Sequence, residues 1–315
     1  MAGLEKKKIL LALDGSGGSM STVEFVAKVM PPVGSEVVLF HVFSRMPETF
    51  WDYTQEPESD VWMNKMKTLE LEHEKTLQAV MQRARQALLD ADFREQSVTV
   101  EIQNRVRGIA RDIAAQSKGG YDLLVMGRNG GNPLNGVAVG SVAHKVIGIL
   151  NALPVCVVTG KPKNQNIIVA LDGSKGSMRA VDYLCSFVDK FDGNVILLHA
   201  MRRIGFPESS PGQDNPFEEV EKTVWEDARQ LIEPFMDQAK ARLVEAGVKQ
   251  DNIMLKIATG VPSRAGALIE EAQNSRCGSI MVGRTGVSQV EDFNIGRVCN
   301  KVVQRAKDMA VWVVP

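Results

Sequence analysis

Residues 8–16 read KILLALDGS and residues 166–174 read NIIVALDGS, so an apolar run closed by an Asp-Gly-Ser turn occurs twice in this chain. A second pair, VVLFH at 37–41 and VILLH at 195–199, is separated by the same 158 residues. A constant offset between separate segments indicates two copies of one domain. Two copies are too few for a solenoid, so the sequence predicts a tandem duplication.

Composition marks the border between the two copies. Gly160-Lys-Pro-Lys-Asn164 is a polar stretch with glycine and proline that follows an apolar run, as expected of a connection between structural units. We therefore expect one domain at 1–160 and a second at 161–315. Because the linker is short, we expect the two domains to pack together.

Short apolar runs alternate with longer amphipathic segments in both copies, which predicts an α/β fold with a parallel sheet flanked by helices. Near-continuous runs such as Ile-Ile-Val-Ala-Leu indicate strands buried on both faces. In the first copy we expect strands at 8–13, 36–42, 97–103, 122–126 and 155–158, with helices at 19–30, 66–91, 109–116 and 141–150. In the second copy we expect strands at 167–171, 194–199, 253–257, 279–282 and 311–314. The segments 44–64 and 202–217 are predicted to be irregular surface loops.

The overall composition is that of an ordinary globular protein, with 44% hydrophobic residues, 24% charged residues and a formal net charge of -1. There is no excess of positive charge to attract a nucleic-acid backbone, and no apolar stretch approaches the length of a membrane span. We therefore expect neither nucleic acid nor a membrane as a partner. The cysteines show neither C-x-x-C spacing nor a disulfide framework, which predicts reduced thiols and a cytoplasmic location. They are Cys156, Cys185, Cys277 and Cys299.

A glycine pattern follows the fourth expected strand of each copy. The spacing G-x2-G-x9-G-S is made by Gly127, Gly130, Gly140 and Ser141, and it recurs, with arginine in place of serine, at Gly283, Gly286, Gly296 and Arg297. Glycine lets a backbone approach a ligand closely and reach positive φ. The N-terminus of the following helix supplies N–H donors and a favourable dipole for phosphate. The pattern in the first copy therefore predicts a phosphate-binding loop.

Asp14 closes the first strand, where a carboxylate can accept hydrogen bonds from ribose hydroxyls. It can equally cap the next helix through Asp14-Gly15-Ser16, and the two roles are compatible. The turn that follows lacks both the G-K-[ST] of a P-loop and the G-x-G-x-x-G of a dinucleotide fold, which argues against those two classes.

Three features together resemble the universal stress protein family, in a tandem pair that covers nearly the whole chain. They are Asp14 closing the first strand, His41-Val42 closing the second, and the glycine pattern after the fourth. The resemblance implies two tandem Rossmann-like domains of the adenine nucleotide alpha hydrolase-like type, each with a five-stranded parallel sheet of order 3-2-1-4-5. It also implies that the fifth strands, 155–158 and 311–314, pair as an internal pseudo-dimer, and that the chain can assemble further into a homodimer.

The resemblance further implies an adenine nucleotide, ATP or else AMP or ADP, at the carboxyl ends of the first and fourth strands. Residues that would line the adenosine are Ala12, Asp14, Val42, Met126 and Gly127. Residues that would meet the ribose and phosphates are Asn129, Gly130, Gly140, Ser141 and Val142. Magnesium or manganese would bind only by bridging phosphates, because no cluster of His, Cys or carboxylates has metal-ligand spacing.

The second copy retains Asp172, Gly283, Gly286 and Gly296, but Arg297 replaces the serine and the loop carries Glu291 and Asp292. The two carboxylates would repel phosphates unless they are paired, whereas Arg297 can itself clamp a phosphate. We expect one competent ATP site per chain and a second site that is weakened or empty. Lys175 is expected to be a solvated lysine that does not compensate.

The histidines are expected to be structural. His41 and His199 end equivalent apolar strands with no partner acid or nucleophile at a supporting spacing, so we interpret them as core residues. His73 and His144 lie among charges and are expected at the surface.

The leading functional hypothesis is a cytoplasmic ATP-binding stress-response protein that acts through a change of conformation or assembly. No residue is assigned a catalytic role, so the most that we expect is slow ATP hydrolysis. The alternative is an interaction scaffold, independent of nucleotide, that docks partners through the segments 44–64 and 202–217. Adenylyl transfer is disfavoured because neither an H-x-G-H signature nor a serine-glycine phosphate loop is present.

Overall fold

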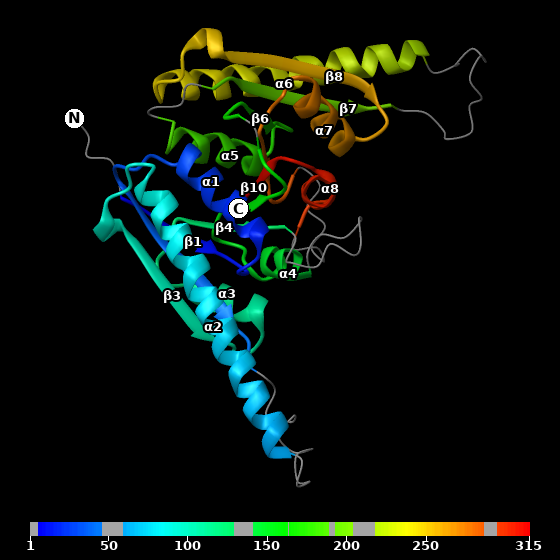
Figure 1. The fold of residues 1–315 in the computed structure, drawn as a ribbon. Coiled ribbons are helices and arrows are strands. Elements are labelled where there is room, and N and C mark those ends of the chain that lie inside the picture. Colours follow the sequence, from blue (N-terminus) through cyan, green and yellow to red (C-terminus); the bar gives the residue numbers. More distant parts are fainter. Residues whose placement is uncertain are drawn as a thin grey trace. The chain divides into compact units, whose positions relative to one another are not determined.

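The computed structural model describes residues 6–45, 59–128, 141–162, 164–188, 193–203, 218–286 and 295–315. The chain divides into two compact units, Met1–Ile149 and Leu150–Pro315. Each unit is an α/β layer structure of strands covered by helices (Figure 1). The units are described one at a time below.

The first unit contains four parallel strands in the order β3-β2-β1-β4. These are β1 (Lys7–Ala12), β2 (Ser35–Phe43), β3 (Val98–Asn104) and β4 (Leu123–Gly127). The central strands β1, β2 and β4 are almost wholly buried, as their β-branched and leucine-rich runs predict. Their carboxyl ends meet at one edge, where the expected nucleotide site begins.

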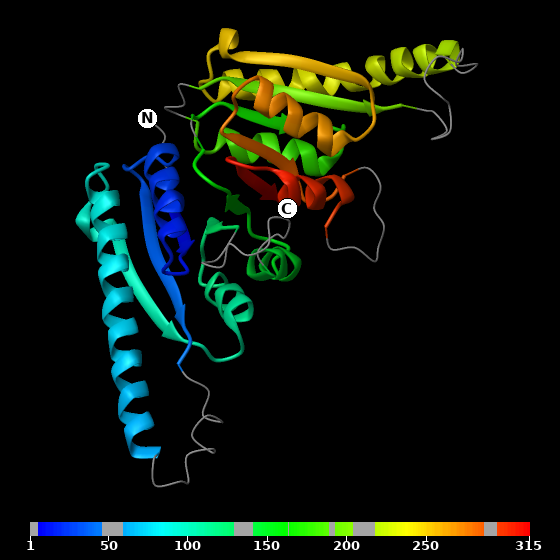
Figure 2. The same cartoon turned by 45° about the vertical axis from the view of Figure 1, so that its right-hand side comes forward.

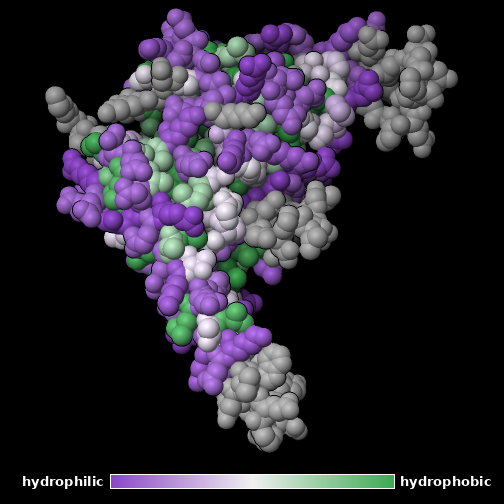
Figure 3. Space-filling model, viewed as in Figure 1, coloured by the Kyte–Doolittle hydropathy of each residue, from purple (hydrophilic) through white to green (hydrophobic). Residues whose placement is uncertain are grey.

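Helices cover this sheet. They are α1 (Gly17–Val29), α2 (Ser59–Leu89), α3 (Ile109–Gln116) and α4 (Ser141–Ile149), with the short 3-10 helix η2 (Glu95–Ser97) before β3. The helix expected at 66–91 starts seven residues earlier, inside the segment predicted to be irregular. The first turns of α2 are charged and contain no alanine, so the sequence there did not predict a helix. Figure 3 shows hydrophobic residues among the hydrophilic ones on α2, where Leu69 and Leu71 are exposed.

The second unit contains a five-stranded parallel sheet in the order β8-β7-β6-β9-β10, which confirms the predicted 3-2-1-4-5 order for the second copy. These strands are β6 (Ile167–Ala170), β7 (Val195–Arg202), β8 (Ile253–Val261), β9 (Ser279–Gly283) and β10 (Ala310–Val314). The helices are α5 (Lys175–Cys185), α6 (Glu218–Glu245), α7 (Arg264–Asn274) and α8 (Arg297–Arg305), with the 3-10 helix η3 (Gln250–Asn252). Within this unit α5 packs against α6, and α7 against α8 (Figure 2).

The fifth strand of the first copy, β5 (Val155–Val158), belongs to the second compact unit. It runs antiparallel to β10, so the two fifth strands pair as the resemblance implied. Trp312 lies opposite Cys156 in this register, and these two residues occupy equivalent positions in the two copies. The expected domain border at 160 lies after β5, whereas the compact units divide before it, because β5 pairs with β10.

Two strand ends differ from the predictions. β7 continues beyond His199 to Arg202, and β8 continues beyond Ile257 to Val261. The two extensions pair with each other through Arg202 and Val261, after a shift of register. Arg202, predicted to start an irregular loop, is therefore the last residue of a strand. The rest of that loop, 204–217, lies outside the described residues, as do residues 46–58 of the first irregular segment.

The four cysteines are unbonded, and burial raises the pKa of each thiol. Among the described helices, none combines the length and the apolar character needed to cross a bilayer. Within the same residues, no group of three or more His, Cys, Asp or Glu side chains could hold a metal ion.

Candidate functional site

In the first unit, the described candidate residues other than Ser141 and Val142 lie at or just after the carboxyl ends of three strands. Ala12 is in register with Met126 on the neighbouring strand β4, and Gly127 ends that strand. Val42 lies near the end of β2 and is buried. Val142 is half-buried in the first turn of α4, which begins at Ser141. Asn129, Gly130 and Gly140 lie outside the described residues.

Asp14 is occupied by the turn that follows it. Its Oδ1 accepts hydrogen bonds from the Ser16 backbone N–H at 3.0 Å and the Ser16 hydroxyl at 2.7 Å, and also from the Ser19 hydroxyl. These bonds hold the turn before α1, but no side-chain hydrogen bond caps the helix at Ser16. The carboxylate is exposed, so its second oxygen can face a ligand while the first holds the turn.

In the second unit, all five candidate residues line one cavity of about 700 Å³. They are Asp172, Gly283, Gly286, Gly296 and Arg297. The cavity opens at the carboxyl ends of β6, β7 and β9, the edge where open α/β sheets bind ligands. Its volume lies within the range of about 300–1,000 Å³ typical of small-molecule sites. We call it the second-copy cavity.

The glycines of this cavity are packed closely against backbone and carboxylate. A Cβ on Gly283 would lie 2.7 Å from the Gly176 carbonyl carbon, at the start of α5. A Cβ on Gly286 would collide with the Asp172 carboxylate. At Gly283 the close approach of two backbone segments therefore requires glycine whether or not a ligand is bound, whereas at Gly286 the Asp172 side chain can turn aside.

The floor of the cavity is apolar. Leu171, Ala200, Leu268 and Val282 line it and are buried. An apolar wall of this kind accommodates the face of a flat ring or another apolar body.

The rim of the cavity is cationic. Arg202 at the end of β7, Arg264 at the start of α7, and Arg297 and Lys301 on α8 all line the cavity and are exposed. Arg264 donates from Nε to the Ala200 carbonyl oxygen at 3.2 Å. Within the described residues none of these four side chains forms an ion pair, and Asp172 is the one carboxylate among the lining residues. The rim therefore favours an anion.

Helix dipoles add to this positive potential. Both α7 and α8 start with an arginine at the cavity, and neither has an acidic residue in its first turn. A cation at the positive end of a helix opposes the helix dipole, at a cost of about 0.3–1 kcal/mol. Two such arrangements at one cavity reduce stability, and a bound anion would relieve both.

His199 lies inside the same cavity and is held as a neutral side chain. Its Nδ1 lies 2.7 Å from the Leu171 carbonyl oxygen, so Nδ1 carries the proton and Nε2 is left as an acceptor. Burial lowers the pKa of His199, and the nearby Arg264 lowers it further. His41 makes the equivalent 2.7 Å contact with Leu13 in the first copy, and burial lowers its pKa too. His41 is buried, as expected of a core residue, whereas His199 is half-buried and lines the second-copy cavity.

This arrangement predicts a pH dependence of stability. The folded-state pKa of His199 lies below its ordinary value of 6.5, so the unfolded chain binds the proton more readily. Stability is then complete above about pH 6.5 and decreases as the pH falls toward the folded pKa. Urea unfolding at about pH 7.5 and pH 5.5 should show a smaller acid-induced loss of unfolding free energy for His199→Gln than for the wild type. Equal losses in the two proteins would contradict this assignment.

Sequence reasoning missed Arg202, Arg264, Lys301 and the cavity-facing role of His199. A comparison of the two copies contains the signal for two of them. Ser44 stands where the second copy has Arg202, and Ile109 starts α3 where Arg264 starts α7. Lys301 has a lysine at the equivalent position of the first copy, so comparing the two copies gives no signal for it. Lys175 is exposed and is not among the residues lining the cavity, in agreement with its expected role as a solvated lysine.

Comparisons with known proteins agree with this architecture. A family profile described as the universal stress protein family matches residues 6–159 and 163–315. Universal stress protein MJ0531 of Methanocaldococcus jannaschii is 25% identical over 158 residues, which is 50% of this chain and 85% of that protein. A universal stress protein from Archaeoglobus fulgidus has a similar fold, with a TM-score of 0.57, 18% identity and 98% of each chain covered. A protein described as a putative universal stress protein from Pseudomonas aeruginosa gives a TM-score of 0.57 at 14% identity, over 98% of this chain and 92% of that one.

Proposed function

The chain belongs to the universal stress protein family, and on that premise we propose that it is a cytoplasmic adenine-nucleotide-binding protein. ATP is the proposed ligand of the first domain, with a magnesium or manganese ion bridging its phosphates. Binding is proposed to act through a change of conformation or assembly, including assembly of a homodimer.

The observation that carries this proposal is the second-copy cavity. It combines an apolar floor, a cationic rim and two helix N-termini at the carboxyl edge of a parallel sheet. A nucleotide has the matching parts, because its base is flat and largely apolar on its faces and its phosphates are anionic. We propose that this cavity is a second anion-binding site and that Arg297 replaces the serine as the phosphate donor.

The two domains are proposed to share one adenosine position and to differ at the phosphates. In the first domain Ser141 would donate its hydroxyl and N–H to phosphate, beside the acid-free loop 131–139. In the second domain the Arg297 guanidinium would do so, against the repulsion of Glu291 and Asp292, which lie outside the described residues.

The test is calorimetric titration of the full chain with ATP. Ser141→Ala should weaken the first site, and Arg297→Ala should weaken the second by about tenfold or more, since a hydrogen bond to a charged group contributes about 1.5–3 kcal/mol. Lys175→Gln is the matched control, because Lys175 starts a helix but does not line the cavity.

Three stoichiometries have distinct meanings in that titration. Two bound ATP molecules per chain would support both proposed sites. A single bound ATP molecule that is lost with Ser141→Ala but not with Arg297→Ala would reject the proposed second site. If ATP neither binds nor raises the midpoint of thermal unfolding, the proposed function fails. A nucleotide-independent scaffold would then be favoured, and its docking face would include exposed residues of α2 such as Leu69 and Leu71.

A further inference from the structure

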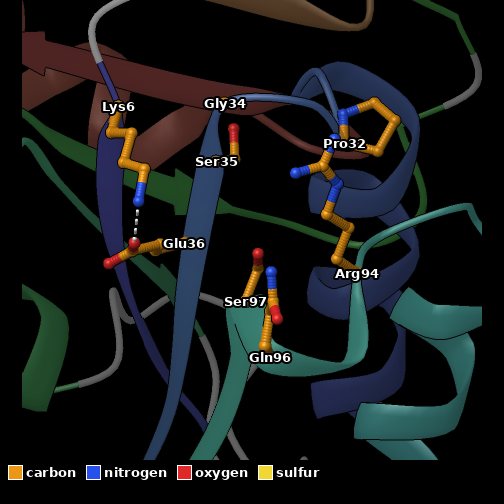
Figure 4. Close-up of a pocket in the computed structure, with 8 residues that line it drawn as sticks. All are labelled: Lys6, Pro32, Gly34, Ser35, Glu36, Arg94, Gln96 and Ser97. Atoms are coloured by element: carbon orange, nitrogen blue, oxygen red, sulfur yellow. Dashed lines mark hydrogen bonds and ion pairs between the residues drawn. The ribbon is translucent and has the colours of Figure 1, made fainter.

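A second cavity, of about 300 Å³, lies in the first unit at the opposite ends of the strands from the expected nucleotide site (Figure 4). It is lined by residues at the beginnings of three parallel strands. Lys6 precedes β1, Ser35 is the first residue of β2, and Ser97 ends η2 just before β3. We call it the amino-edge cavity.

The hydroxyl of Ser35 is the most informative group in the amino-edge cavity. Ser35 is only 2% exposed, and its Oγ has no hydrogen-bond partner within the described residues. Buried polar groups in proteins are nearly always paired, since an unpaired one loses its hydration without compensation. Ser35 lines the cavity, but its Oγ is closed off from solvent, so a ligand can supply the missing partner only when the neighbouring side chains move aside.

Positive charge lies on both sides of that hydroxyl. The Arg94 guanidinium lies across the cavity from Lys6 (Figure 4) and forms no ion pair within the described residues. Lys6 reaches Glu36 at 3.2 Å, but the two side chains are 80% and 44% exposed. Surface pairs of this kind are weak, so an anion can share Lys6. Two cations and one carboxylate leave the lining with a formal charge of +1.

Two further side chains that line the amino-edge cavity are hydrogen-bond donors. Ser97 lines the cavity with a second hydroxyl and Gln96 with a side-chain amide, close together in Figure 4. A guanidinium fork and an ammonium, together with two hydroxyls, exceed what a two-oxygen carboxylate can use. They match the several acceptor oxygens of a phosphate group.

We propose that the amino-edge cavity binds a phosphate group, carried by inorganic phosphate or by a small phosphate monoester. Arg94 and Lys6 supply its charge neutralisation, and the Ser35 and Ser97 hydroxyls supply neutral donors. The site is separate from the proposed nucleotide sites and does not depend on them.

The probe is inorganic phosphate, added to the ¹⁵N-labelled full chain at constant ionic strength maintained with potassium chloride. The amide signals of Gly34, Ser35 and Ser97 should shift and saturate, and these signals report on this cavity even if phosphate also enters a nucleotide site. Arg94→Gln should weaken the binding that they report at least tenfold. Arg111→Gln removes an exposed arginine elsewhere in the same unit and should leave the binding unchanged.

Ser35→Ala provides an independent readout. The alanine variant loses an unpaired buried hydroxyl, so its thermal midpoint without phosphate should equal or exceed that of the wild type, while the gain on adding phosphate should shrink. The proposal is overturned if the local amide shifts do not saturate, if Arg94→Gln leaves them unchanged, or if Ser35→Ala is destabilised without phosphate.

Discussion

Trp312→Ala is expected to lower the unfolding free energy of the second unit by about 3–5 kcal/mol, the usual cost of truncating a buried tryptophan. Trp312 is 1% exposed in the middle of β10. Its ring stacks on Phe187, with centroids 5.4 Å apart and planes 19° apart, and a tilted contact to Tyr183 lies on the same side. Alanine would remove these contacts and leave a cavity that the strands of the sheet cannot close.

The effect should be visible as a fall in the thermal midpoint, by about 2–4 °C for each kcal/mol in a domain of this size, followed by circular dichroism. Trp312→Phe is the first control, because it retains a stacked ring and should lose much less. Cys156→Ala is the second, because it truncates the residue directly opposite on β5, at the equivalent position of the other copy. A loss for Trp312→Ala no larger than that for Cys156→Ala would contradict the assigned role.

The tryptophan also shows what could be predicted from the sequence. The strand at 311–314 and its pairing with 155–158 were expected, because apolar β-branched runs at a constant offset define the same element twice. The partners of Trp312 were not expected. Phe187 follows a helix more than a hundred residues earlier, and only the winding of that helix over the sheet brings the two rings together. Strand pattern is local in sequence, whereas core packing is not.

The residues of the candidate site also fall into a group that local sequence predicts and a group that it does not. The five predicted residues of the second copy share one cavity because strand ends and glycine turns are local features. Arg264 and His199 enter the same cavity through the helix start after β8 and the side-chain direction on β7. His199 was assigned to the core because its apolar neighbours are visible in the sequence. The cavity that His199 lines is formed in part by residues of α7, so it could not be predicted from the sequence neighbours of His199.

Gly283→Ala is expected to destabilise the second unit by about 1–3 kcal/mol, the usual cost of overpacking. The added Cβ would lie 2.7 Å from the Gly176 carbonyl carbon and 3.0 Å from the Ser177 backbone nitrogen. Both atoms belong to the backbone at the start of α5, so the helix or the strand end must move. Since Gly283 also lines the second-copy cavity, binding of an anionic ligand there should weaken as well. Urea unfolding and titration with ATP measure the two effects.

The matched control is Gly127→Ala, at the same position of the motif in the first copy. Among the described residues its Cβ would meet only the Thr22 hydroxyl oxygen, at 3.4 Å, an ordinary contact, so stability should change little or rise slightly as the unfolded chain loses freedom. Equal losses for both variants would show that the two glycines serve one common role.

The expected difference between Gly283→Ala and Gly127→Ala also bears on the evidence for phosphate binding in the second copy. If packing alone requires Gly283, then the survival of the glycine pattern in the second copy is no evidence for phosphate binding, and that inference must rest on Arg264, Arg297 and the rim of the cavity.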